Sequence, residues 1–351
     1  MFEKLESEPR ILLEVALRPV QGDRFQPTGF ADLGAADYVR PDGTRMLLVE
    51  SAQSVANRLE ATCLSGAGPR IAEELDGLPY ILVRLNGAAD AETSSLVEAH
   101  RINSPYIISD KAFSALFAEK TAYKKGGLLD WRRIAATFMS FDPNSLLHGV
   151  FMANFEDGRI RIPRALSGFV EAEDVREAAS GGVKNNPLDP TGSIRAVGFD
   201  KDVYGNVPYH RTEYTAGSIK AYFNFDLALL SGLGLPEEAR RLLVALGLYK
   251  VRRFLSTGLR LRTACDLEPV DGIVVRRPAT FEVPEKEELL AAIQNGIRAC
   301  GENDLFADPR VTEIHAAVVE KKKNKEEAVG SDGEPAEEAG NTEDDPASGE
   351  D

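Results

Sequence analysis

The chain has 351 residues, of which 43% are hydrophobic, and this length suits one large domain or two ordinary ones. No stretch approaches the roughly 20 apolar residues that a membrane-spanning helix needs. The first ten residues, MFEKLESEPR, lack the basic and then apolar layout of a signal peptide, so a cytoplasmic protein without a membrane partner is expected.

The net charge of −15 argues against a nucleic-acid binder, but the charge is unevenly distributed. Residues 326–351 hold eleven acidic and no basic side chains, which leaves 41 basic against 45 acidic side chains in residues 1–325. A nearly balanced body can still carry a basic groove. The composition predicts one domain over residues 1–325, followed by a disordered acidic tail.

Metal and cofactor chemistry find no support in the sequence. The three cysteines are scattered and form no CxxC pair, so they are expected to be small buried residues. The four histidines lie far apart and show no HxxxH or HExxH spacing. No phosphate-loop, dinucleotide or nucleophile-elbow motif occurs in a supporting context. We therefore expect no metal, no cofactor and no catalytic residue.

The first half of the chain alternates strands and helices. Residues 11–17 (ILLEVAL) predict a central strand buried on both faces, and a long polar loop follows over residues 18–38. Residues 51–63 predict a helix that Ser51 caps. Its polar stripe carries Ser51, Ser54 and Arg58. Residues 80–85 (YILVRL) predict a second core strand.

An insertion and two hairpins are expected next. Residues 88–141 have a mainly helical and loop-like pattern. Residues 146–154 and 159–163 predict a hairpin around an Asp-Gly turn. Residues 180–192 are loop-like, and residues 194–199 and 207–212 predict a second hairpin within this excursion. Another strand is expected over residues 219–229.

The last folded part begins with a helix that starts at Pro236. Beyond it, basic residues crowd between Lys250 and Arg262, and the alternation in GLRLR places Arg260 and Arg262 on one strand face. The order of elements predicts an α+β fold, most economically a split βαβ core with large insertions. Many proteins that bind single-stranded RNA have this fold.

Three segments are candidates for binding a sugar-phosphate backbone. The start of the 51–63 helix offers unpaired N–H groups beside Ser51, Gln53 and Ser54, although an ordinary capped helix has the same pattern. The strand pair Arg260 and Arg262 is less easily explained as a solvated helix end. The third segment is the 18–38 loop, which combines charge, amides and an aromatic residue.

Asp32 and one further segment leave alternatives open. The same loop contains Asp32, which could position a metal for cleavage of a bound strand, but no histidine or third carboxylate is near it in sequence. The segment from Arg101 to Tyr106 (RINSPY) is equally compatible with a contact loop and with a simple turn.

Four strings carry a family likeness: LRPVQGDRFQPTGFADLGAA, LLVESAQSVANRLEATC, VEAHRINSPYI and GLRLRTACDLE. Together they resemble the CRISPR-associated RAMP backbone subunit of type I-U (I-G) systems over about residues 10–280. SAQSVANR also resembles the SSQSxKR helix of backbone subunits in other type I systems. Ser51, Gln53 and Ser54 match this pattern, whereas Ala56 and Asn57 replace its Lys-Arg, so Arg58 is expected to supply the charge.

The resemblance implies a ferredoxin-like (RRM-like) palm, helical fingers within residues 88–141 and a β-hairpin thumb near residues 178–214. It implies that copies stack head to tail along a guide RNA, with other effector subunits, and that the guide pairs with target DNA. The expected RNA-binding residues are Arg18, Gln21, Arg24, Gln26, Ser51, Gln53, Ser54, Asn57, Arg58, Arg260 and Arg262. The expected function is a non-catalytic guide-RNA scaffold. The alternatives are a metal-dependent endoribonuclease of the same superfamily that uses Asp32, and a protein-only assembly factor that recruits partners through its tail.

Overall fold

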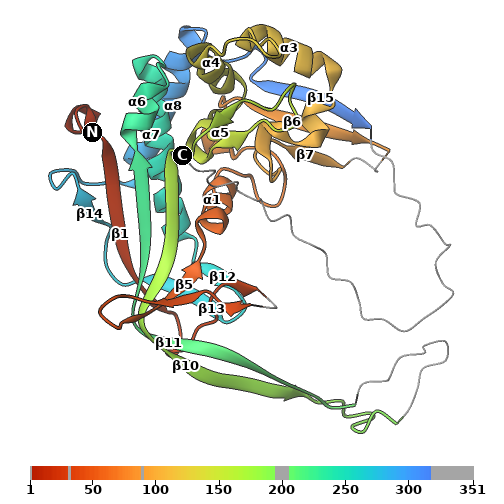
Figure 1. The fold of residues 1–351 in the computed structure, drawn as a ribbon, viewed down its shortest axis with the longest axis vertical. Helices are drawn as coiled ribbons and strands as arrows, with labels where there is room; N and C mark the ends of the chain where they lie inside the picture. The colour runs from red at the N-terminus through yellow and green to blue at the C-terminus, as the bar shows by residue number, and fades with distance from the viewer. Residues whose placement is uncertain (1, 31–32, 88–90, 194–204, 318–351) are drawn as a thin grey trace, which may run out of the picture. The chain divides into compact units, whose positions relative to one another are not determined.

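Eight strands form the main sheet of the computed structural model, which describes residues 2–30, 33–87, 91–193 and 205–317. The strand order is β12-β13-β1-β11-β10-β5-β4, every pair in it is antiparallel, and β14 also pairs with β1. The strands are β1 (Arg10–Pro19), β4 (Asp37–Val39), β5 (Arg45–Glu50), β10 (Leu166–Lys184), β11 (Val207–Asp226), β12 (Arg260–Arg262), β13 (Cys265–Pro269) and β14 (Val274–Arg277). The predicted α+β class is confirmed (Figure 1).

The prediction of a strand over residues 11–17 is confirmed, but the prediction that both of its faces are buried is wrong. Ile11, Leu13, Val15 and Leu17 are buried, whereas the residues between them are only half-buried. Phe223 and Phe225 of the neighbouring strand β11 alternate with half-buried residues in the same way. The core therefore lies against one face of the sheet, and apolar residues in ILLEVAL also occupy the opposite, partly open face.

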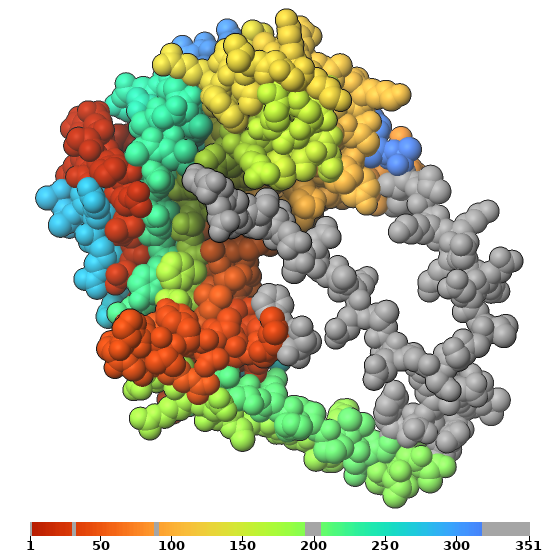
Figure 2. All heavy atoms as spheres, viewed as in Figure 1, coloured from red at the N-terminus to blue at the C-terminus, as the bar shows by residue number. Residues whose placement is uncertain are grey.

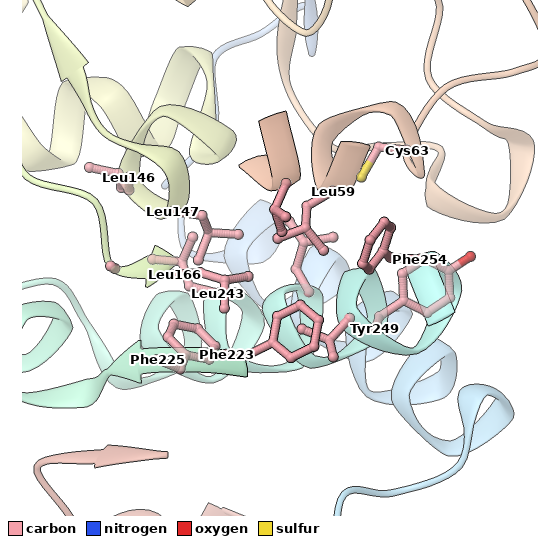
Figure 3. Close-up of a cluster of buried hydrophobic side chains, with 14 of the residues drawn as sticks. Leu59, Cys63, Leu146, Leu147, Leu166, Phe223, Phe225, Leu243, Tyr249 and Phe254 are labelled. Carbon is pink, nitrogen blue, oxygen red and sulfur yellow. The ribbon is translucent and has the colours of Figure 1, made fainter. Parts of the chain in front are cut away.

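Three helices supply much of this core: α1 (Ala52–Ala61), α7 (Glu237–Ser256) and α8 (Lys286–Glu302). Gly247 of α7 lies so close to Phe225 that an added Cβ would be 2.5 Å from its ring, so the helix approaches the sheet closely. Figure 3 shows side chains of the core drawn from α1 and the turn after it, from α7, from strands β10 and β11, and from the short helix α5 (Pro143–His148). They include Leu59, Cys63, Leu146, Leu147, Leu166, Phe223, Phe225, Leu243, Tyr249 and Phe254. The short helix α6 (Leu227–Gly232) joins β11 to α7.

The predicted helices are confirmed with small shifts. Ser51 is the N-cap of α1, as expected, and its hydroxyl accepts a hydrogen bond from the Ser54 amide. Pro236 occupies the N-cap position of α7, one residue before the first helical position. Helix α7 continues to Ser256, so the basic run from Lys250 to Arg262 is divided between the end of a helix and β12.

A second sheet of three strands, in the order β15-β6-β7, lies at the insertion. Its strands are β6 (Tyr80–Asn86), β7 (Glu92–Ser94) and β15 (Val311–Ala317), so the predicted strand over residues 80–85 is confirmed. The predicted helical character of residues 88–141 is also confirmed. The remaining elements are η1 (Phe2–Leu5), β2 (Gly29–Phe30), β3 (Gly34–Ala35), η2 (Glu73–Leu75), η3 (Arg101–Asn103), α2 (Pro105–Ile108), α3 (Lys111–Thr121), α4 (Trp131–Phe141), α5 (Pro143–His148), β8 (Val150–Phe151) and β9 (Arg161–Ile162). The predicted hairpin around Asp157 exists but is shorter, since residues 146–148 belong to α5.

Strands β10 and β11 form a long two-stranded ribbon. They pair from Leu166 with Phe225 to Lys184 with Val207, so the predicted loop over residues 180–192 is wrong for its first five residues. The predicted hairpin is also wrong in its pairing, because residues 207–212 pair with residues 179–184; residues 194–199 lie outside the described residues.

The ribbon is distorted at Asp174, where it leaves the sheet. The register omits Asp174 and Gly217, and Asp174 has a φ of +53°. Strand β5 pairs with β10 only up to Glu173, and β1 pairs with β11 only as far as Ile219. Beyond this point the two strands pair with each other (Figure 1), and Tyr214 of β11 also forms an isolated bridge with Phe25. The break therefore separates a sheet-bound half of the ribbon from a distal half.

In chain order, α1 lies between β1 and β10, and α7 lies between β11 and β13. The spatial order of these four strands is β13-β1-β11-β10. The predicted acidic tail, residues 326–351, falls outside the described residues. Within the described ranges, no helix has the length and apolarity required to cross a bilayer.

Candidate nucleic-acid interface

Glu50, at the end of β5, is the buried centre of the candidate interface. Its side chain is fully buried, and it accepts hydrogen bonds from the guanidinium groups of Arg58 and Arg262 and from the hydroxyl of Ser54. The Arg58 Nε–Glu50 Oε1 distance is 3.0 Å. Two cations and a helix start are thereby fixed around one carboxylate.

Arg262 connects β12 to two other segments. Its Nη1 donates to the carbonyl oxygens of Val49, at 2.8 Å, and Gln26, at 3.1 Å. Burial lowers the pKa of its guanidinium from the ordinary value. Because its donors are directed at the protein backbone and at Glu50, Arg262 braces the loop after β1 against β5 and is only a minor part of the outer surface.

Arg58 has a similar role from α1. Its Nη1 donates to the carbonyl of Arg260 at 3.4 Å, and its Nη2 donates to the carbonyl of Leu261. Burial lowers the pKa of this guanidinium as well. A hollow of about 330 Å³ opens beside it, between α1, the end of α7 and β12. Arg58 therefore joins α1 to β12 across about 200 residues of sequence.

The first two turns of α1 present amides to the outside. Gln53 and Asn57 are exposed, and the Gln53 Nε2 donates to the Asn57 Oδ1 at 3.1 Å. Arg164, which the sequence analysis did not select, donates to the Gln53 Oε1 at 2.7 Å and to the Ala52 carbonyl at 3.1 Å. This stretch thus combines amide groups with one more half-buried guanidinium.

The loop after β1 is attached to the ribbon and to β13. Phe25 is buried and forms a two-way backbone bridge with Tyr214, with N–O distances of 2.9 Å. The backbone N–H of Gln26 donates to the Ala264 carbonyl. The side-chain Oε1 of Gln26 is buried and has no hydrogen-bond partner among the described atoms. Arg24 lies 3.8 Å from Glu213 and donates to the Ala179 carbonyl.

Three arginines are the exposed cations of this region. The side chains of Arg18, Arg24 and Arg260 keep 64%, 54% and 70% of their surface exposed. Arg18 pairs with Glu268 at 2.7 Å, and Arg260 lies 3.9 Å from Asp266. Such exposed pairs contribute only about 0–1 kcal/mol, so a phosphate can replace either carboxylate at little cost.

Contacts join Gln26, Ser51, Ser54, Arg58, Arg260 and Arg262, which come from the three distant segments, and Gln53 and Asn57 lie on the same helix. Arg18 is linked to Arg260 through β13, because their partners Glu268 and Asp266 are two residues apart on that strand. Among the described residues, no hydrogen bond or ion pair joins Gln21 or Arg24 to this group; Gln21 is exposed, and Arg24 lies against the ribbon. We call the surface formed by α1, β12 and the loop after β1 the α1–β12 wall; its residues are Arg18, Arg24, Gln26, Ser51, Gln53, Ser54, Asn57, Arg58, Arg260 and Arg262. Sequence reasoning missed Glu50 and Arg164. The available signal for Glu50 was a carboxylate that ends an apolar strand directly before a helix cap.

Other sequence candidates lie elsewhere. Lys250, which was grouped with the basic run, is fully buried; its Nζ lies 2.8 Å from the His148 Nε2 and hydrogen-bonds to the Asn144 Oδ1. It is therefore not a surface cation. All three cysteines are free and buried, as predicted. Asp32 lies outside the described residues, and among those that are described no three His, Cys, Asp or Glu side chains are grouped as metal ligands.

Arg101, from the predicted contact loop or turn, is likewise buried. Its guanidinium forms a paired contact with the Glu60 carboxylate, at 2.6 and 2.7 Å. It also donates to the Gly149 carbonyl at 2.9 Å. Arg101 thus joins the insertion to the last turn of α1 and is not a surface contact.

Comparison with known proteins gives one family match. Residues 11–177 match the family model described as CRISPR-associated protein GSU0053, and no curated protein matches the chain. Two similar solved chains come from structures described as "CRISPR RNA-guided surveillance complex, pre-nicking" (15% identity, TM-score 0.40, covering 84% of this chain and 89% of that chain) and "CRISPR RNA-guided surveillance complex" (14%, 0.36, 84% and 84%). A third is "Crystal structure of Thermofilum pendens Csc2" (10%, 0.29, 85% and 79%).

Proposed function

We propose that this chain is a non-catalytic guide-RNA-binding backbone subunit of a type I CRISPR effector complex, of subtype I-U (I-G). The observation that carries this proposal is the α1–β12 wall, where three segments separated by up to about 240 residues supply cations and amides to one surface. The match of residues 11–177 to a CRISPR-associated family model supports the biological setting.

The topology supports the fold that this function requires. The order β13-β1-β11-β10, with α1 and α7 as the connecting helices, supports a ferredoxin-like palm, whose chain order is strand, helix, strand, strand, helix, strand. The helical insertion within residues 88–141 is then the fingers, and the distal ribbon within residues 178–214 is the thumb. In this arrangement copies of the chain stack along the guide, contact other effector subunits and leave guide bases free to pair with target DNA.

In the wall, the half-buried arginines position the structure and the exposed arginines contact the RNA. Arg58 and Arg262, held by Glu50, fix the positions of α1, β12 and the loop after β1. Arg18, Arg24 and Arg260 then offer their exposed guanidinium groups to phosphates, and Gln53 and Asn57 offer amides to ribose or phosphate oxygens. Contacts of this kind hold a backbone without reading its sequence.

The test is the salt dependence of binding to a single-stranded RNA of mixed sequence. The double variant Arg18→Gln with Arg260→Gln removes two exposed cations, so the slope of log K against log salt is expected to become shallower by about 1.4, at about 0.7 per phosphate for single strands. Arg276→Gln is the control, because Arg276 is similarly exposed and paired, with Glu14, but lies on β14.

An unchanged slope in the double variant, together with full affinity, would refute the assignment of the wall. Purification of the complex supplies an independent check. RNA is expected to accompany the protein, and the mass of the protein–RNA particle is expected to rise in steps as the RNA is lengthened. A particle of constant mass at every RNA length would contradict the stacking of copies.

A further inference from the structure

The hairpin β8–β9 carries an exposed stack of an aromatic ring and a guanidinium. Phe151 and Arg161 are directly paired across the two strands, and the Arg161 Cζ lies 4.0 Å from the centre of the Phe151 ring. Phe151 retains 38% of its surface, and Arg161 is exposed. Ile160 and Ile162 point to the interior instead. The outer face of this hairpin is therefore one small flat platform and not a broad apolar patch.

Arg161 differs from the arginines of the wall in its charge balance. Across residues 2–30, 33–87, 91–193 and 205–317, no carboxylate forms an ion pair with it, and no hydrogen bond of its guanidinium is recorded. By contrast, Arg18, Arg24 and Arg260 each face a carboxylate within 4 Å. An unneutralised guanidinium lying flat on an aromatic ring has its remaining donors and its outer face available to a ligand.

Two other arginines brace this hairpin against both ends of α1. At the far end of the helix, Arg101 pairs with Glu60 at 2.6 Å and donates to the Gly149 carbonyl, just before β8. At the first turn, Arg164 donates to the Ala52 carbonyl at 3.1 Å and to the His148 carbonyl at 3.3 Å. In Figure 2 the yellow-green atoms around α5 lie on the visible surface. The platform is thus held beside the wall before any ligand binds, which reduces the ordering cost of binding.

We propose that Phe151 and Arg161 form a stacking site for one unpaired nucleobase of the RNA strand that the α1–β12 wall holds. This site rests on the proposed function and adds a contact to a base where the wall contacts only the backbone. A base has a flat π-face that stacks on both an aromatic ring and a guanidinium plane, whatever its identity. The site is therefore sequence-tolerant and specific for a single-stranded nucleotide.

The experiment uses short single-stranded RNAs that carry one fluorescent 2-aminopurine at successive positions, bound to the full-length chain. At one position the fluorescence is expected to fall on binding, because the base stacks. Phe151→Ala is expected to abolish this change and to weaken binding by about 5- to 150-fold, the range of one base–aromatic stack. Phe151→Trp is expected to retain both, and Arg161→Lys, which loses the plane but keeps the charge, to reduce the quenching.

Phe2→Ala is the matched control. Arg241 also covers the ring of Phe2, at 5.4 Å, but it is ion-paired with Glu237, so this variant is expected to bind RNA like the parent chain. An abasic nucleotide at the quenched position tests the same contact with unmodified protein. It is expected to reproduce the loss caused by Phe151→Ala and to add nothing when the two are combined.

Two failures are distinguishable. If the parent chain binds no single-stranded RNA, both the proposed function and the stacking site are overturned. If the chain binds RNA through the wall, but neither Phe151→Ala nor any abasic position alters affinity or fluorescence, the stacking site alone is overturned.

Discussion

Glu50 shows how a single acid can organise a cationic surface. Arg58 and Arg262 are repelled by each other in isolation, yet both approach the same fully buried carboxylate. Burying a carboxylate is costly unless charged partners and hydrogen bonds satisfy it, and here two guanidinium groups and a hydroxyl do so. The spacing of the arginines in the sequence was enough to select them as candidates. Glu50 could not be selected in the same way, because a single Glu after an apolar strand resembles any strand end.

Glu50→Gln is expected to destabilise the chain by about 2–4 kcal/mol. The value is discounted from the 3–5 kcal/mol of a broken buried pair because Arg58 and Arg262 keep 31% and 24% of their side-chain surface exposed. Urea unfolding measures the change. Glu268→Gln, which breaks only the exposed pair with Arg18, should cost less than about 1 kcal/mol. Equal effects of the two substitutions would show that Glu50 does not organise the wall.

At the scale of elements, local pattern predicted helices well and long-range pairing poorly. Ser51 and the apolar spacing after it were sufficient for α1, since capping and amphipathicity are local. Residues 180–184 were assigned to a loop because Gly181 and Gly182 suggest a turn. In the ribbon, however, Gly181 is needed for close approach, as an added Cβ would lie 2.6 Å from the Tyr209 carbonyl oxygen. The need for a glycine at this position becomes visible only when the partner strand β11 is in place.

The buried N-cap of helix α5 is expected to make the stability of the chain depend on pH. Asp142 caps it by accepting hydrogen bonds from the Asn144 amide at 3.1 Å and from the Ser145 hydroxyl at 2.8 Å. Burial raises the pKa of Asp142 from 3.8 to about 6. Burial and nearby Lys250 lower the pKa of His148, at the other end of α5, well below its ordinary value. The two groups therefore affect stability in opposite directions between pH 4 and 6.5.

Asp142→Asn is expected to become more stable relative to the parent chain as pH rises. Because the folded state holds the proton of Asp142 more tightly, the parent's stabilisation from this group is present below pH 4 and is lost as pH rises through 6. The difference in unfolding free energy between variant and parent should therefore increase by about 2–3 kcal/mol between pH 4 and 7. Chemical denaturation at several pH values measures it, and the contribution of His148 largely cancels in the difference. A pH-independent difference would contradict the buried, proton-binding cap.

At the scale of the whole molecule, the wall depends on contacts that no local pattern contains. Arg262 reaches Val49 and Gln26 across 213 and 236 residues of sequence. The family resemblance, and not periodicity, suggested that these segments act together. The hydrophobic core extends along only part of the β10–β11 ribbon. Buried residues line the ribbon up to Val175 and from Glu213 onward, whereas the distal ribbon is mostly exposed on both faces.

Replacing residues 181–210 with an Asn-Gly turn, between the paired residues Ser180 and Arg211, is therefore expected to leave stability within about 1 kcal/mol of the parent chain. The described residues of this segment bury almost no apolar surface, and the ion pair of Arg211 with the buried Glu213 is kept. Thermal and urea unfolding measure this. The shortened chain should still bind a short RNA, but should no longer assemble in regular steps on a long one. A loss of several kcal/mol, or unaltered stepwise assembly, would contradict a distal ribbon that serves contacts outside its own core.

The break at Asp174 does not free the whole distal ribbon, because the loop after β1 holds it through the Phe25–Tyr214 bridge and the bond from Arg24 to the Ala179 carbonyl. Five residues of β10, from Ser180 to Lys184, lie past the last of these contacts, which corresponds to about 17 Å of extended chain. A tilt of about 10° at Ala179 would displace the end of this paired segment by about 3 Å while the backbone pairing stays intact. If copies of the chain stack as proposed, this segment can follow a variation of a few ångström in their spacing without unfolding.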